Sequence, residues 1–177
     1  TMRGMKPAAV VHTGDFFHRS TPGNRPMIVA LSQLRKLADA KIPVIVIAGN
    51  HSTPRTAVTS PILEAFRSIP GVHPIFSQRY ERVELDGVAF HGVPHAHEES
   101  RFGEELARVE PDTDSINVLM LHTSLGKRYL MEEYGERVFP DERMDMLSRF
   151  EYVALGHWHG FQKAHGRTVD ILIFIDE

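Results

Sequence analysis

The sequence lacks cysteine altogether, and this absence excludes both disulfide bonds and thiolate metal sites. Any transition-metal site must therefore be built from His, Asp, Asn or Glu side chains. No uninterrupted apolar run approaches the ~20 residues that cross a bilayer, so we expect no membrane partner. Basic residues are not in excess, because the net charge is −3, whereas nucleic-acid-binding domains usually carry a strong positive charge. The lack of cysteine fits a cytoplasmic protein.

Short apolar runs rich in β-branched residues recur along the chain, whose 177 residues suffice for one domain (1–177) with its own core. Near-continuous apolarity over so few residues predicts strands that are buried on both faces. The runs are Ala8–Val11, Val44–Ala48, Val88–Phe90, Ile116–Leu121, Tyr152–Leu155 and Val169–Ile175.

Helical periodicity fills several of the intervals between these runs. It is clearest over Met27–Ala40, where Pro26 suits the first turn of a helix. The segment Tyr80–Gly92 predicts a β-hairpin, with Asp86-Gly87 as its tight turn. Alternation of strands and helices predicts an α/β fold. The other helix candidates are Pro61–Ser68, Glu98–Arg108 and Asp141–Arg149.

Polar residues of metal-ligand type follow four of the predicted strands. In open α/β sheets, catalytic groups gather beyond the carboxyl ends of the strands. A glycine precedes the polar residue in three of the four cases, which permits a sharp turn and a close approach of the backbone. The motifs are Gly14-Asp15 with His18, Gly49-Asn50-His51, His122, and Gly156-His157 with His159.

Each motif has a structural interpretation when it is taken alone. A single histidine after a strand is more often a hydrogen-bonded structural residue, and Gly-Asp or Gly-Asn pairs are ordinary turn chemistry. The His157-x-His159 pair is a better metal signal, because alternate residues of an extended segment point the same way. The ordered combination of all four motifs favours a metal site.

The ordered set of Gly-Asp-x-x-His, Gly-Asn-His, His and Gly-His-x-His resembles the calcineurin-like metallophosphoesterases. His18, Thr21-Pro22 and Gln162 resemble the SbcD and Mre-type double-strand-break nucleases of that superfamily. The resemblance covers about Ala8 to Lys163. It implies an αββα sandwich, that is, two mixed sheets flanked by helices. It also implies metal-dependent phosphodiester hydrolysis, with DNA ends as the substrate and a coiled-coil ATPase subunit as a partner.

The resemblance also implies a ligand set for two divalent ions, usually manganese, although iron or zinc would suit the same oxygen and nitrogen donors. Asp15 would bridge the ions. Asn50, His122 and His157 would complete one of them, and His159 would belong to the other.

The resemblance further implies catalytic residues. His51 is similar to the residue that binds the scissile phosphate and protonates the departing oxygen, and His18 to the residue that positions the DNA phosphate. Arg19 and Arg55, which follow these motifs, could hold flanking phosphates; their alternative interpretation is solvated loop charge. For a second His-x-His pair, His95 and His97, we favour a structural or helix-start role. We expect His12, His73, His91 and His165 to be structural.

The sequence departs from the family pattern in several places. No Asp-x-His motif precedes Gly14, and Ser52 stands where the family usually has an aspartate that supports the histidine. After Lys163 we find neither the Tyr-x-Gly-Ser turn nor a capping domain. We therefore expect an incomplete domain that lacks its first strand and helix. Its first ion would be under-occupied, its turnover low, and its exposed sheet edge would favour a homo-oligomer.

Two other functions fit the same residues. One is a non-catalytic metal-binding fragment. The other is a small-molecule phosphodiesterase of the same superfamily.

Overall fold

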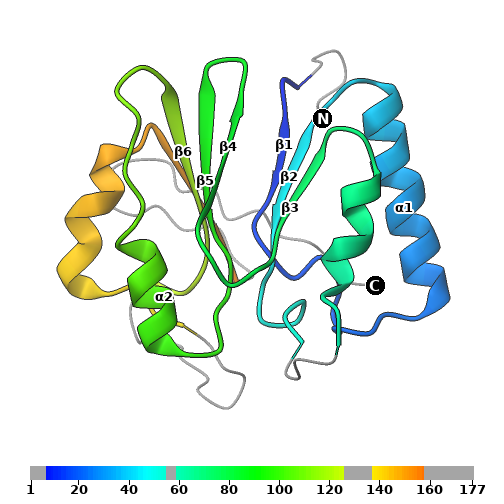
Figure 1. Cartoon of the computed structure of the whole chain (residues 1–177), viewed down its shortest axis with the longest axis horizontal. Coiled ribbons are helices and arrows are strands. Elements are labelled where there is room, and N and C mark those ends of the chain that lie inside the picture. The colour runs from blue at the N-terminus through cyan, green and yellow to red at the C-terminus, as the bar shows by residue number, and fades with distance from the viewer. Residues whose placement is uncertain (1–6, 55–58, 126–136, 158–177) are drawn as a thin grey trace.

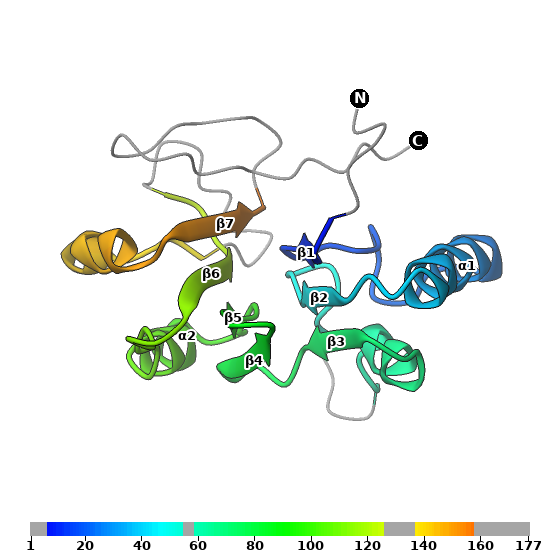
Figure 2. The ribbon, with the colours of Figure 1, turned by 90° about the horizontal axis from the view of Figure 1, so that it is seen from above.

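The computed structural model describes residues 7–54, 59–125 and 137–157 of the chain. Two β-sheets face one another, and helices cover the outer face of each, which gives the four layers of the expected αββα sandwich (Figures 1 and 2). The first sheet has the order β1 (Val10–His12), β2 (Val44–Ile47), β3 (Val72–Ile75). The second has the order β4 (Glu81–Leu85), β5 (Val88–Val93), β6 (Ile116–His122), β7 (Tyr152–Gly156).

Helices lie on the outer side of each sheet. The first sheet is covered by α1 (Asn24–Asp39) and the 3₁₀ helix η1 (Ile62–Ser68). The second is covered by α2 (Glu99–Leu106) and the 3₁₀ helix η3 (Asp141–Arg149). Over the described part of the chain, no helix has the length and apolar character needed to span a membrane.

The two sheets differ in strand direction, whereas we expected both to be mixed. The first is parallel throughout its described strands, and the second is parallel except for the antiparallel β4–β5 pair. That pair is the hairpin predicted around Asp86-Gly87, where both residues adopt left-handed conformations, with φ of 50° and 80°. A tight hairpin joins two neighbouring strands in antiparallel pairing, and among the described strands only β4 and β5 are joined in this way.

Apolar side chains fill three layers between these elements. In β2, Ile45 and Ile47 pack toward the second sheet, whereas Val44 and Val46 pack toward α1. This alternation explains why the strand reads as a continuous apolar run, since both of its faces are buried. The third layer joins the second sheet to its helices and includes Phe102, Phe139 and Phe150.

Some elements differ from the sequence prediction. We missed β3, because Pro74 interrupts its pattern; the strand tolerates proline at the edge of the three-stranded sheet. Two short helix candidates are 3₁₀ rather than α-helical, and each begins with an i→i+3 bond to the carbonyl of a proline, Pro61 or Pro140. The predicted strand Val169–Ile175 lies outside the described residues.

Candidate metal centre

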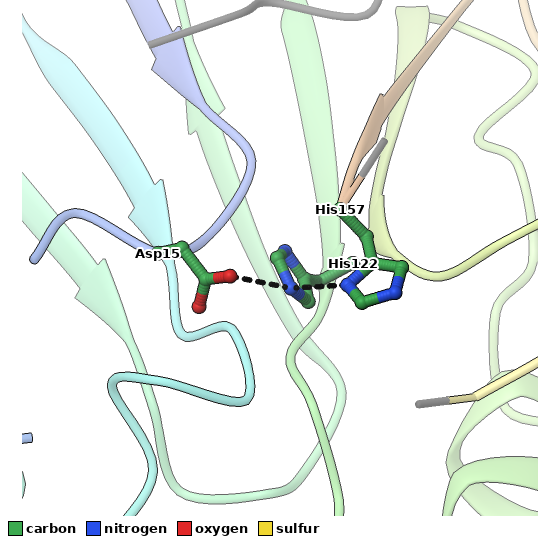
Figure 3. Close-up of side chains that lie close together, drawn as sticks. All are labelled: Asp15, His122 and His157. Carbon is green, nitrogen blue, oxygen red and sulfur yellow. Dashed lines mark hydrogen bonds and ion pairs between the residues drawn. The ribbon is translucent and has the colours of Figure 1, made fainter. Parts of the chain in front are cut away.

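The carboxyl ends of β1, β2, β6 and β7 bring four of the predicted ligands together. Asp15 follows β1, Asn50 follows β2, His122 ends β6 and His157 follows β7. Ligand atoms of Asp15, His122 and His157 all lie within 4.8 Å of one another. Figure 3 shows the His122 ring between the other two side chains.

The geometry at His122 makes the centre suitable for a cation. Its Nδ1 lies 2.7 Å from the Thr13 carbonyl oxygen. Because a carbonyl only accepts, Nδ1 carries a proton, and Nε2 is the ring atom that faces the other side chains. It lies 2.9 Å from Asn50 Oδ1, 3.2 Å from Asp15 Oδ2 and 3.3 Å from His157 Nδ1. When Nε2 carries a proton it pairs with the Asp15 carboxylate, and a bound cation would replace that proton among the same oxygen and nitrogen atoms.

Asp15 is held as a carboxylate. Burial alone would raise its pKa, but the charge and hydrogen bond of His122 and the backbone N–H of His51 lower the pKa to about 2. That N–H donates to Asp15 Oδ1 at 2.9 Å. Asp15 and His157 both have left-handed backbones, with φ of 46° and 98°, which side-chain-bearing residues rarely adopt. Such strain concentrates at functional sites.

Glycines allow the loops to approach one another closely, as the motifs predicted. A Cβ on Gly49 would lie 2.2 Å from Asp15 Oδ1. A Cβ on Gly156 would lie 1.8 Å from the Thr13 carbonyl oxygen, the atom that fixes the proton of His122. Sequence patterns could not identify Thr13, because it orients His122 through its backbone carbonyl, a group that every residue type has.

The His51 ring lies beside this centre. Its Nδ1 donates to the His18 carbonyl oxygen at 2.7 Å, and the two rings stack with centroids 5.2 Å apart. This bond fixes the proton on Nδ1 and leaves Nε2 for another group. Ser52, which stands where the family usually has aspartate, is fully buried, and its hydroxyl has no hydrogen-bond partner among the residues that the structure describes. The backbone of His18, rather than Ser52, therefore orients His51.

The other predicted site residues lie beside this cluster or outside the described residues. Arg19 is exposed one residue beyond His18. His159 and Arg55 lie outside the described residues. His95 is buried near the centre, and burial together with the charges of His122, Arg137 and His97 lowers its pKa to about 3.

A family comparison agrees with this geometry. Residues 2–161 match the sequence profile of the family described as calcineurin-like phosphoesterase. The chain belongs to this family.

Within it, the chain is similar to archaeal proteins named DNA double-strand break repair protein Mre11. The protein of Sulfurisphaera tokodaii is 35% identical over 170 residues, which make up 92% of this chain and 42% of that protein. The protein of Sulfolobus acidocaldarius is 34% identical over 160 residues, 88% of this chain and 40% of that protein. The chain thus spans about two-fifths of the length of these curated relatives.

Proposed function

We propose that this chain forms the catalytic core of a metal-dependent phosphodiesterase, an exonuclease of the Mre type that acts on DNA ends. The observation that carries the proposal is the convergence of Asn50 Oδ1, Asp15 Oδ2 and His157 Nδ1 on His122 Nε2. The donors are all oxygen or nitrogen, which suits manganese, with iron and zinc as alternatives.

In this proposal Asn50, His122 and His157 hold one ion, and Asp15 bridges it to a second ion that His159 also binds. Ions so placed lower the pKa of bound water and neutralise charge on the phosphate oxygens. In this polypeptide, Asp15 and His159 are the only residues that we assign to the second ion, so we expect that ion to be bound more weakly.

The histidine pair would handle the phosphate. His51 has its Nδ1 proton committed to the His18 carbonyl, so its Nε2 is the atom that would contact the scissile phosphate and protonate the departing oxygen. The exposed ring of His18 stacks on His51 and would contact the DNA backbone beside it. Arg19 and Arg55 would hold flanking phosphates.

DNA is the proposed substrate because of the similarity to proteins named for double-strand break repair. From the resemblance of its motifs to the SbcD and Mre-type branch we propose a coiled-coil ATPase subunit as a partner, and a second copy of the chain stays a prediction from the exposed sheet edge. A cytoplasmic location stays a prediction from the lack of cysteine.

The test is manganese-dependent hydrolysis by the longest natural protein that contains this chain. An aryl phosphodiester reports any phosphodiesterase activity, and duplex DNA ends compared with cyclic nucleotides report the substrate class. We expect cleavage of duplex ends, and a fall of about 10²–10⁴-fold with measurable residual activity in His51→Ala, with His73→Ala as a histidine control on β3. Preference for cyclic nucleotides would favour the small-molecule function, and no hydrolysis of any substrate would favour the non-catalytic one.

A further inference from the structure

The second His-x-His pair does not join the metal centre, and one of its members instead contacts the loop that carries His51. The His97 Nε2 lies 2.8 Å from the carbonyl oxygen of Pro54. Because the carbonyl only accepts, the ring donates through Nε2 and has no lone pair there for a metal. Pro54 lies in the same loop segment, Gly49–Pro54, as Asn50 and His51.

The backbone around His97 is fixed from two directions. Its N–H donates to Gln78 Oε1 at 3.0 Å. Its carbonyl accepts from Arg137 Nη2, and the carbonyl of Ala96 accepts from Arg137 Nε at 3.1 Å. Gln78 is itself held, since its carbonyl accepts from Arg101 Nε at 3.3 Å. The ring of His97 thus projects from a segment that is anchored to the β3–β4 loop and to the chain beyond β6.

The other end of the His51 loop is anchored by the same segment. The N–H of His95 donates to the carbonyl of Ala48 at 2.9 Å, directly before Gly49. Inside the loop, Thr53 Oγ1 and the Ser52 N–H both donate to the Gly49 carbonyl, at 2.8 Å and 3.2 Å. The described segment Gly49–Pro54 is therefore held at its start by the backbone of His95 and at Pro54 by the ring of His97.

We propose that His97 is a positioning residue for His51. The proposal rests on the proposed function, in which the His51 ring must lie within hydrogen-bond reach of a phosphate. The one ring hydrogen bond that His51 makes in the described structure goes to the exposed segment at His18. Small displacements of a catalytic group reduce the rate strongly, so a second anchor on the same loop protects the geometry.

Two substitutions separate positioning from general destabilisation. His97→Ala removes the donor to Pro54, and His97→Gln places an amide N–H near the position of Nε2. We expect kcat/KM for duplex ends to fall about five- to tenfold in His97→Ala, the equivalent of about one net hydrogen bond, and to recover in His97→Gln. Manganese affinity should change less than kcat/KM, because the backbone N–H of His95 still holds Ala48, two residues before Asn50.

A double-mutant cycle with His51→Ala is the decisive arm. If His97 acts through His51, His97→Ala has no further effect once His51 is gone. A full five- to tenfold loss in the His51→Ala background would overturn the proposal. The control is His73→Ala, for which we expect neither an activity loss nor any coupling to His51.

Hydrogen exchange of residues 49–54 tests the anchor without any activity. We expect faster exchange of this segment in His97→Ala but not in His97→Gln or His73→Ala. Unchanged exchange in His97→Ala would overturn the proposal, whatever the enzyme does. If the wild-type protein cleaves no phosphodiester, the proposed function fails, while the exchange result still decides whether His97 holds the loop.

Discussion

The second sheet carries two clusters around buried histidines, and the clusters differ in how their polar atoms are paired. At the candidate metal centre, oxygen and nitrogen atoms of Asp15, Asn50 and His157 surround His122 Nε2. In the other cluster, which we call the His91 network (Tyr80, His91, Asp112 and Asn117), every donor meets an acceptor. The Tyr80 hydroxyl donates to His91 Nδ1 at 2.8 Å, and His91 Nε2 donates to Asn117 Oδ1 at 3.0 Å. Asn117 Oδ1 also accepts the Asp112 N–H at 2.8 Å, and Nδ2 donates to the Asp112 carbonyl at 2.8 Å.

Burial alone does not tell whether a histidine is structural, because His91 is fully buried and His122 nearly so. Their partners differ, since His91 hydrogen-bonds to Tyr80 and Asn117, whereas a carboxylate, an amide oxygen and a second imidazole surround His122 Nε2. A satisfied polar network stabilises a fold by itself, whereas a set of metal-type ligands around one point gains further stability when a cation binds.

The largest effect on stability should come from Gly156, where the backbone approaches Thr13 closely at the candidate metal centre. Gly156→Ala places a methyl group 1.8 Å from the Thr13 carbonyl oxygen, and backbone atoms cannot move aside as a flexible side chain can. We expect the free energy of unfolding to fall by about 3 kcal/mol or more, measured by urea denaturation. Gly103→Ala is the control: no atom lies within 4 Å of its added Cβ, and in α2 it should stabilise by about 0.5–1 kcal/mol. Equal effects would show that the close approach in the structure is wrong.

Asn50→Ala should weaken manganese binding by more than the ~10–100-fold that is typical of residues one shell away from a metal. Without metal, the same change should lower the free energy of unfolding by only about 1 kcal/mol, because it removes one hydrogen-bond partner of His122 and leaves the Asp15 pair in place. Calorimetric titration and urea denaturation in chelator measure the two effects. Manganese affinity equal to that of the wild type would remove Asn50 from the ligand set.

Asn117→Ala should show the reverse pattern. It leaves the His91 Nε2–H and the Asp112 N–H without their acceptor, which costs about 2 kcal/mol of stability. Manganese affinity should stay within about twofold of the wild-type value, because Asn117 is not among the proposed ligands. A tenfold change in affinity would correspond to about 1.4 kcal/mol. A strong loss of metal affinity without a loss of stability would erase the distinction between the clusters.

The smallest effect concerns pH. Burial lowers the pKa of His91 below 6.5, although its hydrogen bond to Asn117 opposes this. The unfolded chain then binds more protons than the folded one below pH 6.5, so stability falls as the pH falls. His12 and His95, with pKa values of about 4 and 3, act in the same direction. In chelator between pH 7 and 5, His91→Gln should flatten this decline by less than ~1.4 kcal/mol per pH unit. An unchanged slope would mean that His91 is not held neutral.

The strand ends could be predicted from the sequence because their chemistry is local. Apolar runs followed by Gly-Asp, Gly-Asn or His placed Asp15, Asn50, His122 and His157 at one edge, and the structure brings their side chains together. The metal roles that we assign to them stay predictions. The hairpin at Asp86 was equally local, since turn chemistry specifies it.

The tertiary contacts could not be predicted in this way. Nothing in the sequence pairs His91 with Asn117, or His97 with Pro54, because 26 and 43 residues separate the partners and no periodicity links them. The contribution of the Thr13 carbonyl is invisible for a related reason, since every residue type has the same backbone oxygen. Strand β3 escaped detection because Pro74 breaks the apolar run that marked its neighbours.

The central claim is that His122, Asn50, Asp15 and His157 surround a cation. Anomalous diffraction from crystals of the protein grown with manganese tests it most directly. We predict a peak about 2.0–2.4 Å from His122 Nε2 and Asn50 Oδ1, with Asp15 and His157 completing the ligand set. A manganese peak elsewhere, or no peak at this centre, would contradict this prediction.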